Sequence, residues 1–175
     1  MLSTGGTIEK TYNESDGTLG NQRSVLDIML ASLVLHGVVI DRVAVMNKDS
    51  LDMTAADHDQ ITLVAGAYAN SHDGVVIVHG TDRLQQTGEH LVERLGEQPR
   101  VPIVLTGAMR PYELRNTDSI QNLTEALLAV QIVAPGIYVA MHNSVLQFPG
   151  VVKDYVRRTF VKAASHHDMS GQHGR

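Results

Sequence analysis

The sequence contains no cysteine. Disulfides, thiolate metal sites and a cysteine nucleophile are therefore excluded for this chain. No apolar run approaches the roughly 20 residues that a membrane-spanning helix needs, and the first residues do not form a signal peptide. We expect a cytoplasmic protein that has no membrane partner.

Positive charge is also scarce. The chain carries 14 lysines and arginines against 19 aspartates and glutamates, a net charge of −5. Nucleic-acid binding needs a basic face, so nucleic acid is not expected as the main partner. The motifs G-x-x-x-x-G-K-[S/T] and G-x-G-x-x-G are absent, which leaves nucleotide binding with fold-level support only. The nine histidines show no metal-ligand spacing, and we expect neither a metal nor a cofactor.

The pattern that is present is an alternation of strands and helices. With 175 residues, 43% of them apolar, the chain suits one domain with a sizeable core. Short apolar runs predict buried strands, and residues with helical spacing lie between them. The strands are expected at 38–46, 74–79, 102–105 and 136–141, after a first strand of which only Met1 and Leu2 are visible, and the helices at 24–36, 54–71, 85–95 and 117–133.

This alternation predicts an α/β fold, a three-layer sandwich with a mostly parallel, flavodoxin- or Rossmann-like sheet. Residues 1–164 are expected to form one domain, and residues 165–175 a polar C-terminal tail. Thr54 and Asp57 resemble a capping box at the start of the second helix. A buried strand usually has about five or six residues, so the short first strand suggests that the true start lies upstream.

Polar residues follow each expected strand. In an open α/β sheet, ligands bind outside the carboxyl ends of the strands. Turn chemistry explains any one of these loops, but five loops at one edge favour a functional site. The segments are 4–7, 49–52, 80–82, 106–111 and 142–146, the last followed by Lys153.

Three of these side chains can form a catalytic relay. A threonine becomes a nucleophile when a base takes its proton, and a lysine whose pKa is lowered by burial can be that base. Thr81, Lys153 and Asp82 would then act as a hydroxyl–amine–carboxylate unit, with the logic of a serine protease triad. Gly5 and Gly6 give the first loop room for a substrate and a hinge for closure.

Three segments, in this order, resemble the bacterial-type L-asparaginases: S-T-G-G-T-I, V-H-G-T-D and L-T-G-A-M-R-P. The resemblance runs from Leu2 to about Lys153. It implies hydrolysis of a side-chain amide, with L-asparagine as the substrate, through an acyl-enzyme on a threonine. It also implies a homo-oligomer. Usual members have a second domain of more than a hundred residues, and the resemblance does not extend to one here.

The resemblance assigns roles by position. Thr4 resembles the loop nucleophile, and Thr81, Asp82 and Lys153 match the second threonine, its aspartate and the lysine. The sequence does not decide which threonine attacks first. The substrate-binding set comprises Asp82 for the α-ammonium, Ser50 for the α-carboxylate, Leu51 beside it where glutamine is usual, and Ala108 for a backbone contact to the amide.

The family's loop tyrosine has no aligned counterpart, because Gly17 lies nearest. Tyr12 is the alternative source of a phenol on this loop. Three of these residues also have a simpler, structural interpretation. Thr4 can be a turn or cap residue, Lys153 a solvated surface lysine, and Ser50 a helix cap.

His79 is expected to be a hydrogen-bonded core residue rather than a base. Three alternatives to an asparaginase stay open. They are a broader ω-amidase or glutaminase, the amide-hydrolysing component of a tRNA-dependent amidotransferase, and a catalytically weak amino-acid sensor.

Overall fold

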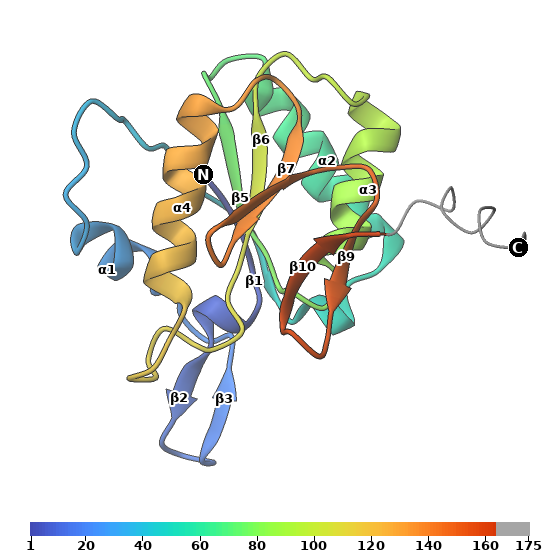
Figure 1. The fold of residues 1–175 in the computed structure, drawn as a ribbon. Coiled ribbons are helices and arrows are strands. Elements are labelled where there is room, and N and C mark those ends of the chain that lie inside the picture. The colour runs from blue at the N-terminus through green and yellow to red at the C-terminus, as the bar shows by residue number, and fades with distance from the viewer. Residues whose placement is uncertain (164–175) are drawn as a thin grey trace, which may run out of the picture.

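A computed structural model of the chain describes residues 1–163. A six-stranded sheet with the order β4-β1-β5-β6-β7-β8 runs through the middle of the molecule (Figure 1). The first five strands in this order are parallel to their neighbours, and β8 is antiparallel to β7. The predicted α/β fold with a mostly parallel sheet is confirmed. The predicted tail at 165–175 lies outside the described residues.

The central strands are short and buried. Val75 and Ile77 on β5 face one side of the sheet, and Val76 and Val78 face the other, so both faces contribute to a core. The strands of this sheet are β1 (Leu2–Gly5), β4 (Val43–Lys48), β5 (Val75–Val78), β6 (Ile103–Thr106), β7 (Ile137–Met141) and β8 (Ser144–Gln147).

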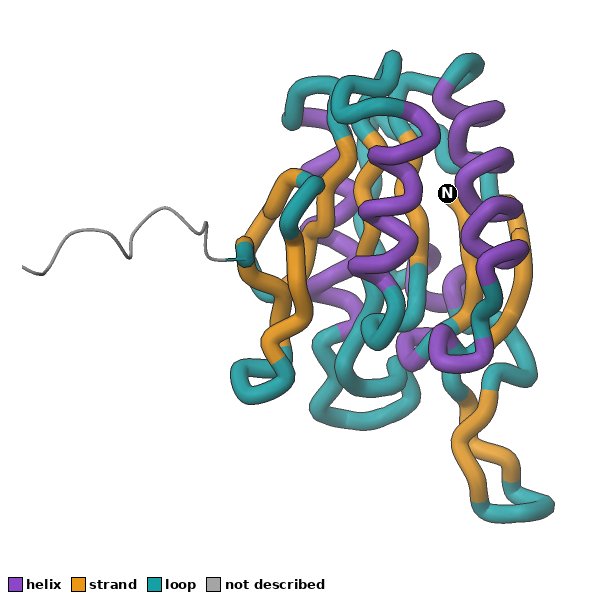
Figure 2. The backbone as a smooth tube through the Cα atoms, turned by 90° about the vertical axis from the view of Figure 1, so that its right-hand side faces the viewer, coloured by secondary structure: helices purple, strands orange, loops and turns teal. Residues whose placement is uncertain are grey.

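Helices cover both faces of the sheet, as the side view in Figure 2 shows. Helices α2 (Ala55–Ala69) and α3 (Leu84–Leu95) supply apolar side chains to one core. Helices α1 (Leu26–Ala31) and α4 (Ser119–Ile132) supply them to the other. The sandwich therefore has three layers, and the sheet edge between the layers stays available for a site.

Two small antiparallel hairpins extend this framework. Strands β2 (Thr11–Asn13) and β3 (Thr18–Gly20) form a hairpin that projects beyond the carboxyl ends of the parallel strands (Figures 1 and 2). Strands β9 (Val151–Asp154) and β10 (Thr159–Lys162) form the second, beside the sheet. Two short 3-10 turns, Thr7–Glu9 and Ser50–Asp52, follow β1 and β4.

Two predicted elements are wrong in extent. Residues 38–42 do not belong to β4, and Val39 is 94% exposed. The helix predicted over 24–36 ends at Ala31, and Leu33 and Leu35 after it pack on the core without helical structure. The capping interaction is confirmed, since the Asp57 carboxylate accepts the backbone N–H of Thr54 at 2.8 Å. Among residues 1–163, none of the helices combines the length and hydropathy that a membrane crossing requires.

Candidate active site

The loops after β1, β4 and β5 meet in direct backbone contact. The N–H of Gly6 donates to the carbonyl of Lys48 at 2.9 Å. A Cβ added at Gly6 would collide with the backbone of Gly80, and one added at Gly80 would lie 2.6 Å from the Ser50 side chain. Only glycine permits this approach. The sequence therefore brings the residues after these glycines to one point on the sheet edge.

The three residues of the predicted relay lie together. The Lys153 amine, on β9, is 2.9 Å from Thr81 Oγ1 and 2.7 Å from Asp82 Oδ1. Its side chain is only 8% exposed, and that of Asp82 is 33% exposed. Lys153 is therefore not a solvated surface lysine. A buried amine within hydrogen-bond distance of one carboxylate and one hydroxyl has the geometry that a proton-relay unit requires.

The assignment of Thr4 as nucleophile needs correction. Thr4 is the third residue of β1 and has no exposed surface. Its hydroxyl donates to the carbonyl of Val78 at 3.0 Å, which ties two neighbouring strands together. A nucleophile must reach the amide carbon of a substrate, and a hydroxyl inside the sheet cannot do so. Thr4 has a structural role.

Thr7 is the hydroxyl that the loop presents instead. It begins the 3-10 turn after β1, is partly exposed, and follows Gly6 in the chain. Gly6 packs against Gly80, so Thr7 and Thr81 are the residues that follow two touching glycines. The short visible first strand was the signal that could have found it, because extending that strand to a usual length places Thr4 inside the sheet.

Ser50 packs against Gly80 at the contact between the loops after β4 and β5. It is 1% exposed, and its hydroxyl has no hydrogen-bond partner among the described residues. Leaving a buried polar group unsatisfied costs about 1–3 kcal/mol, so this hydroxyl would gain from a bound acceptor or donor. Leu51 beside it is 59% exposed. Its N–H donates to Asp49 Oδ1 at 3.1 Å, so Asp49 rather than Ser50 caps this turn.

Ala108 lies on the loop after β6 and is fully buried. The sequence reasoning missed its neighbour Met109, whose sulfur lies 3.7 Å from the Thr81 hydroxyl. It also missed Gln85, whose side-chain oxygen accepts the backbone N–H of Lys153 at 2.7 Å and fixes β9 against α3. Neither residue type signals such a role in a sequence, because each acts through a contact between distant elements.

Tyr12 lies on β2, in the projecting hairpin. Its side chain is 56% exposed, and its backbone N–H donates to the Glu113 carboxylate. Tyr12 thus belongs to the segment that Gly5 and Gly6 connect to β1.

His79 is a core residue, as predicted, and it begins a buried hydrogen-bonded chain. Its Nδ1 lies 2.8 Å from the carbonyl of Gly80, and its Nε2 lies 2.8 Å from the Thr87 hydroxyl. That hydroxyl is also 2.8 Å from His58 Nδ1. Burial lowers the pKa of His79 to about 4, and burial, with the charges of His90 and Arg83, lowers the pKa of His58.

The partners fix the protons in this chain. A carbonyl only accepts, so His79 Nδ1 carries a hydrogen and its Nε2 accepts one from Thr87. The Thr87 oxygen then accepts from His58 Nδ1–H. These three side chains are neutral, and His79 binds the carbonyl of Gly80, the residue directly before Thr81.

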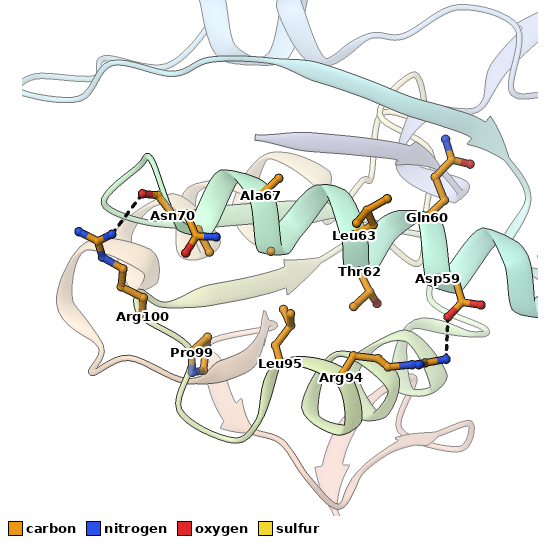
Figure 3. Close-up of a pocket in the computed structure, with 12 residues that line it drawn as sticks. Asp59, Gln60, Thr62, Leu63, Ala67, Asn70, Arg94, Leu95, Pro99 and Arg100 are labelled. Atoms are coloured by element: carbon orange, nitrogen blue, oxygen red, sulfur yellow. Dashed lines mark hydrogen bonds and ion pairs between the residues drawn. The ribbon is translucent and has the colours of Figure 1, made fainter.

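A second concave region lies on the helical face of the molecule. Helices α2 and α3 enclose an open cavity of about 820 Å³ lined by residues such as Thr62, Leu63 and Leu95 (Figure 3). Its lining includes none of the predicted site residues. Among residues 1–163, no three histidine, aspartate or glutamate side chains are grouped so as to hold a metal ion.

Comparison with known proteins agrees with this geometry. The model of the N-terminal asparaginase family matches residues 1–160. The L-asparaginase of Thermococcus kodakarensis is 32% identical over 150 residues, which cover 83% of this chain and 44% of that protein. A component of the glutamyl-tRNA(Gln) amidotransferase of Haloquadratum walsbyi is 34% identical over 146 residues, covering 82% of this chain and 33% of that protein.

Solved structures give the same result. The thermostable L-asparaginase from T. kodakarensis superposes with a TM-score of 0.80 at 31% identity, covering 92% of this chain and 49% of that one. A probable cytoplasmic L-asparaginase from Campylobacter jejuni gives a TM-score of 0.77 at 29% identity, covering 92% and 51%. The chain thus spans a third to a half of the length of these relatives. Fold and sequence together place the chain in the asparaginase family.

Proposed function

We propose that the protein hydrolyses the side-chain amide of L-asparagine to L-aspartate and ammonia through a threonine acyl-enzyme. The observation that carries this proposal is the buried Lys153 amine, 2.9 Å from the Thr81 hydroxyl and 2.7 Å from the Asp82 carboxylate. No cofactor is needed, because hydroxyl, amine and carboxylate groups can supply both the nucleophile and the acid–base steps.

Thr7 is the proposed site of the acyl bond. Its oxygen attacks the amide carbon, its proton passes through the Thr81 hydroxyl to the neutral form of the Lys153 amine, and ammonia leaves with that proton. Water then cleaves the ester and restores the Thr7 hydroxyl. Lys153 donates to Thr81 Oγ1 and so stabilises negative charge that develops there. The Thr81 proton is directed to the Met109 sulfur, a weak acceptor that a substrate or water can replace.

Ser50 and Asp82 are the proposed contacts to the α-groups of the substrate. The unpartnered Ser50 hydroxyl can donate to the α-carboxylate, and the second Asp82 oxygen can accept from the α-ammonium. Ala108 is expected to contribute its backbone to the amide. These contacts fix the distance between α-groups and nucleophile, so an amide one methylene longer is misplaced. Asparagine should therefore be preferred over glutamine.

Tyr12 is proposed to assist after the β2–β3 hairpin closes over the site. Its present exposure of 56% is compatible with an open position. Amide hydrogen exchange of residues 4–21, measured with and without saturating aspartate, checks this closure. Equal protection in both states would contradict it.

The relatives have more than one function. The component of a glutamyl-tRNA(Gln) amidotransferase matches about as well as the asparaginase does, and this favours testing glutamine as a second substrate. A sensor would bind aspartate or asparagine without turnover. The predicted homo-oligomer and cytoplasmic location stay predictions.

The deciding experiment measures ammonia release from asparagine and from glutamine by the purified chain, with Lys153→Met as the inactive control. We expect release from asparagine that Lys153→Met abolishes. Equal kcat/KM for glutamine would support a broad amidase. Binding of asparagine without ammonia release would support the sensor.

A further inference from the structure

Lys153 also lines a cavity beyond the relay. The cavity measures about 940 Å³ and lies between the loop before α4, the β7–β8 turn and the β9–β10 hairpin. It shares two residues with the candidate active site, Lys153 and Met109. Met109 contacts the Thr81 hydroxyl from one side and lines the cavity from the other. A ligand in the cavity would thus lie next to the reacting groups.

Arginines prevail among the charged residues that line the cavity, which is unexpected in a chain with a net charge of −5. Three arginines line it together with the lysine: Arg110, Arg157 and Arg158. Arg110 donates to the neutral carbonyl of Asn116 at 3.0 Å. Arg157 has only a long contact, 3.7 Å, to Asp154. Guanidinium groups without a close carboxylate suit a carboxylate or phosphate ligand, which they can bind with two parallel hydrogen bonds.

One carboxylate lines the cavity, but its hydrogen-bonding capacity is used inside the protein. Asp118 accepts the backbone N–H groups of Met109 at 2.9 Å and Arg110 at 3.0 Å. It also accepts from the Asn122 amide at 2.8 Å and contacts His142 Nε2 at 2.7 Å. Burial tends to raise the pKa of Asp118, yet these hydrogen bonds outweigh it and leave the pKa below its usual value. Asp118 therefore organises the cavity wall.

Arg158 occupies a backbone position that glycine normally fills. It has a φ of 55° in the turn between β9 and β10. Such a conformation is uncommon for residues other than glycine, asparagine and aspartate. An arginine here adds a charge to the cavity where glycine would relax the turn.

We propose that this cavity is an anion subsite, which holds a carboxylate or phosphate group of a ligand next to Lys153. The anion has two possible sources. It can belong to the leaving amine of an N-substituted ω-amide, such as a β-aspartyl dipeptide, or it can be a free anion. We favour the first source because the cavity adjoins the relay, and this part rests on the proposed function. The reaction is then the same hydrolysis: the amide C–N bond breaks, the amine leaves protonated, and water cleaves the threonyl ester.

Binding of inorganic phosphate tests the subsite without any reference to turnover. Calorimetric titration would compare the intact chain with Arg110→Gln, Arg158→Gly and the control Arg100→Gln. Arg100 is exposed and lines the other cavity, between α2 and α3. We expect the Kd for phosphate to rise about fivefold or more in the two cavity variants and to stay unchanged in the control. The melting temperature of Arg158→Gly should be no lower than that of the parent, which excludes unfolding as the cause.

Equal phosphate binding by the parent, the cavity variants and the control would mean an adventitious ion only and would overturn the subsite. Absence of binding by the parent would overturn it as well. Either result leaves the proposed asparagine hydrolysis intact.

The second arm identifies the source of the anion. It compares kcat/KM for β-aspartyl-glycine and β-aspartyl-glycinamide, which share the acyl group and differ in one negative charge. We expect at least a fivefold preference for the charged dipeptide in the parent, and loss of this preference in Arg158→Gly. Equal kcat/KM for the two, with phosphate still bound at the arginines, would overturn the leaving-amine source in favour of a free anion.

Discussion

Two hydrogen-bonded chains of side chains meet at Gly80. One includes Thr81, the residue after it, and the other includes His79, the residue before it. In front of Gly80, at the sheet edge, the Thr81–Lys153–Asp82 chain is charged and partly exposed. Behind it, the His79–Thr87–His58 chain is buried and neutral. Both have the same number of members and similar distances. The first therefore offers an amine and a carboxylate at the sheet edge, and the second has only neutral groups in the core.

The rear chain nevertheless acts on the front one. His79 holds the carbonyl of Gly80, and Thr81 follows directly. We expect the rear chain to determine stability and the front chain to determine turnover, with weak coupling between them. Variants in each cluster, measured for both turnover and stability, test this division.

The largest effects on turnover are expected at Lys153 and at Thr7. Lys153→Met removes the amine from the relay and should lower kcat by about 10²–10⁴-fold, whereas Lys162→Met on β10 should have little effect on kcat. Because Thr81 and Lys153 act as a unit, the double variant Thr81→Ala/Lys153→Met should be little worse than either single one. Ammonia-release kinetics of the four variants check this. Near-normal turnover in Lys153→Met would remove the lysine from the mechanism.

Thr4 and Thr7 show the same division between stability and turnover. Thr7→Val should lower kcat by about 10⁴-fold or more, because the nucleophile is lost, with little change in stability. Thr4→Val should keep most of the activity and cost about 0.5–1.5 kcal/mol of unfolding free energy through the lost hydrogen bond to Val78. Mass spectrometry of acid-quenched enzyme would locate the aspartyl ester. An ester on Thr81 would contradict the assignment to Thr7.

The sequence predicted the central strands because residues buried on both faces form apolar runs with few alternatives. It failed at 38–42, where an equally apolar run crosses the surface and Val39 is 94% exposed. An apolar sequence pattern alone does not show which side chains pack against the core.

In the site, Thr81, Asp82 and Lys153 could be predicted because motif and chemistry agreed. The motif alone does not distinguish Thr4 from Thr7, because both are threonines beside a glycine and the motif does not include the length of the first strand. The sheet register, with Ser3 opposite Ala44 and Gly5 opposite Lys48, shows that Thr4 lies within β1.

The rear chain predicts a pH dependence of stability. The pKa of His79 is about 4 in the folded protein, against 6.5 for an unperturbed histidine. The unfolded state therefore binds the proton more readily, so the contribution is complete above pH 6.5 and is lost as the pH falls towards 4. The total is on the order of 3 kcal/mol.

His79→Gln isolates this contribution. Urea unfolding of parent and variant between pH 7.5 and pH 4.5 should show a smaller loss of stability in the variant. The comparison cancels other groups that titrate nearby, such as Glu9, whose pKa burial raises. Identical pH slopes would show that His79 does not titrate as proposed.

The smallest effect is expected at Leu51, on the rim of the site. Leu51→Gln would add a side chain able to hydrogen-bond the α-groups of the substrate. Because the position is 59% exposed, the gain in kcat/KM for asparagine should be less than about tenfold, and glutamine should stay the poorer substrate. Equal efficiency for both amides in the parent would favour the broad amidase.

The placement of Lys153 on β9 also sets an order of events during synthesis. Asp82 and Lys153 are 71 positions apart in the chain. At about 5–20 residues per second, the ribosome adds the lysine roughly 4–14 s after the aspartate. The parallel strands β1, β4, β5, β6 and β7 can be complete before the amine exists. A chain that terminates before β9 would keep Ser50, Thr81 and Asp82 but lack the amine, so under the proposed function it could not hydrolyse an amide.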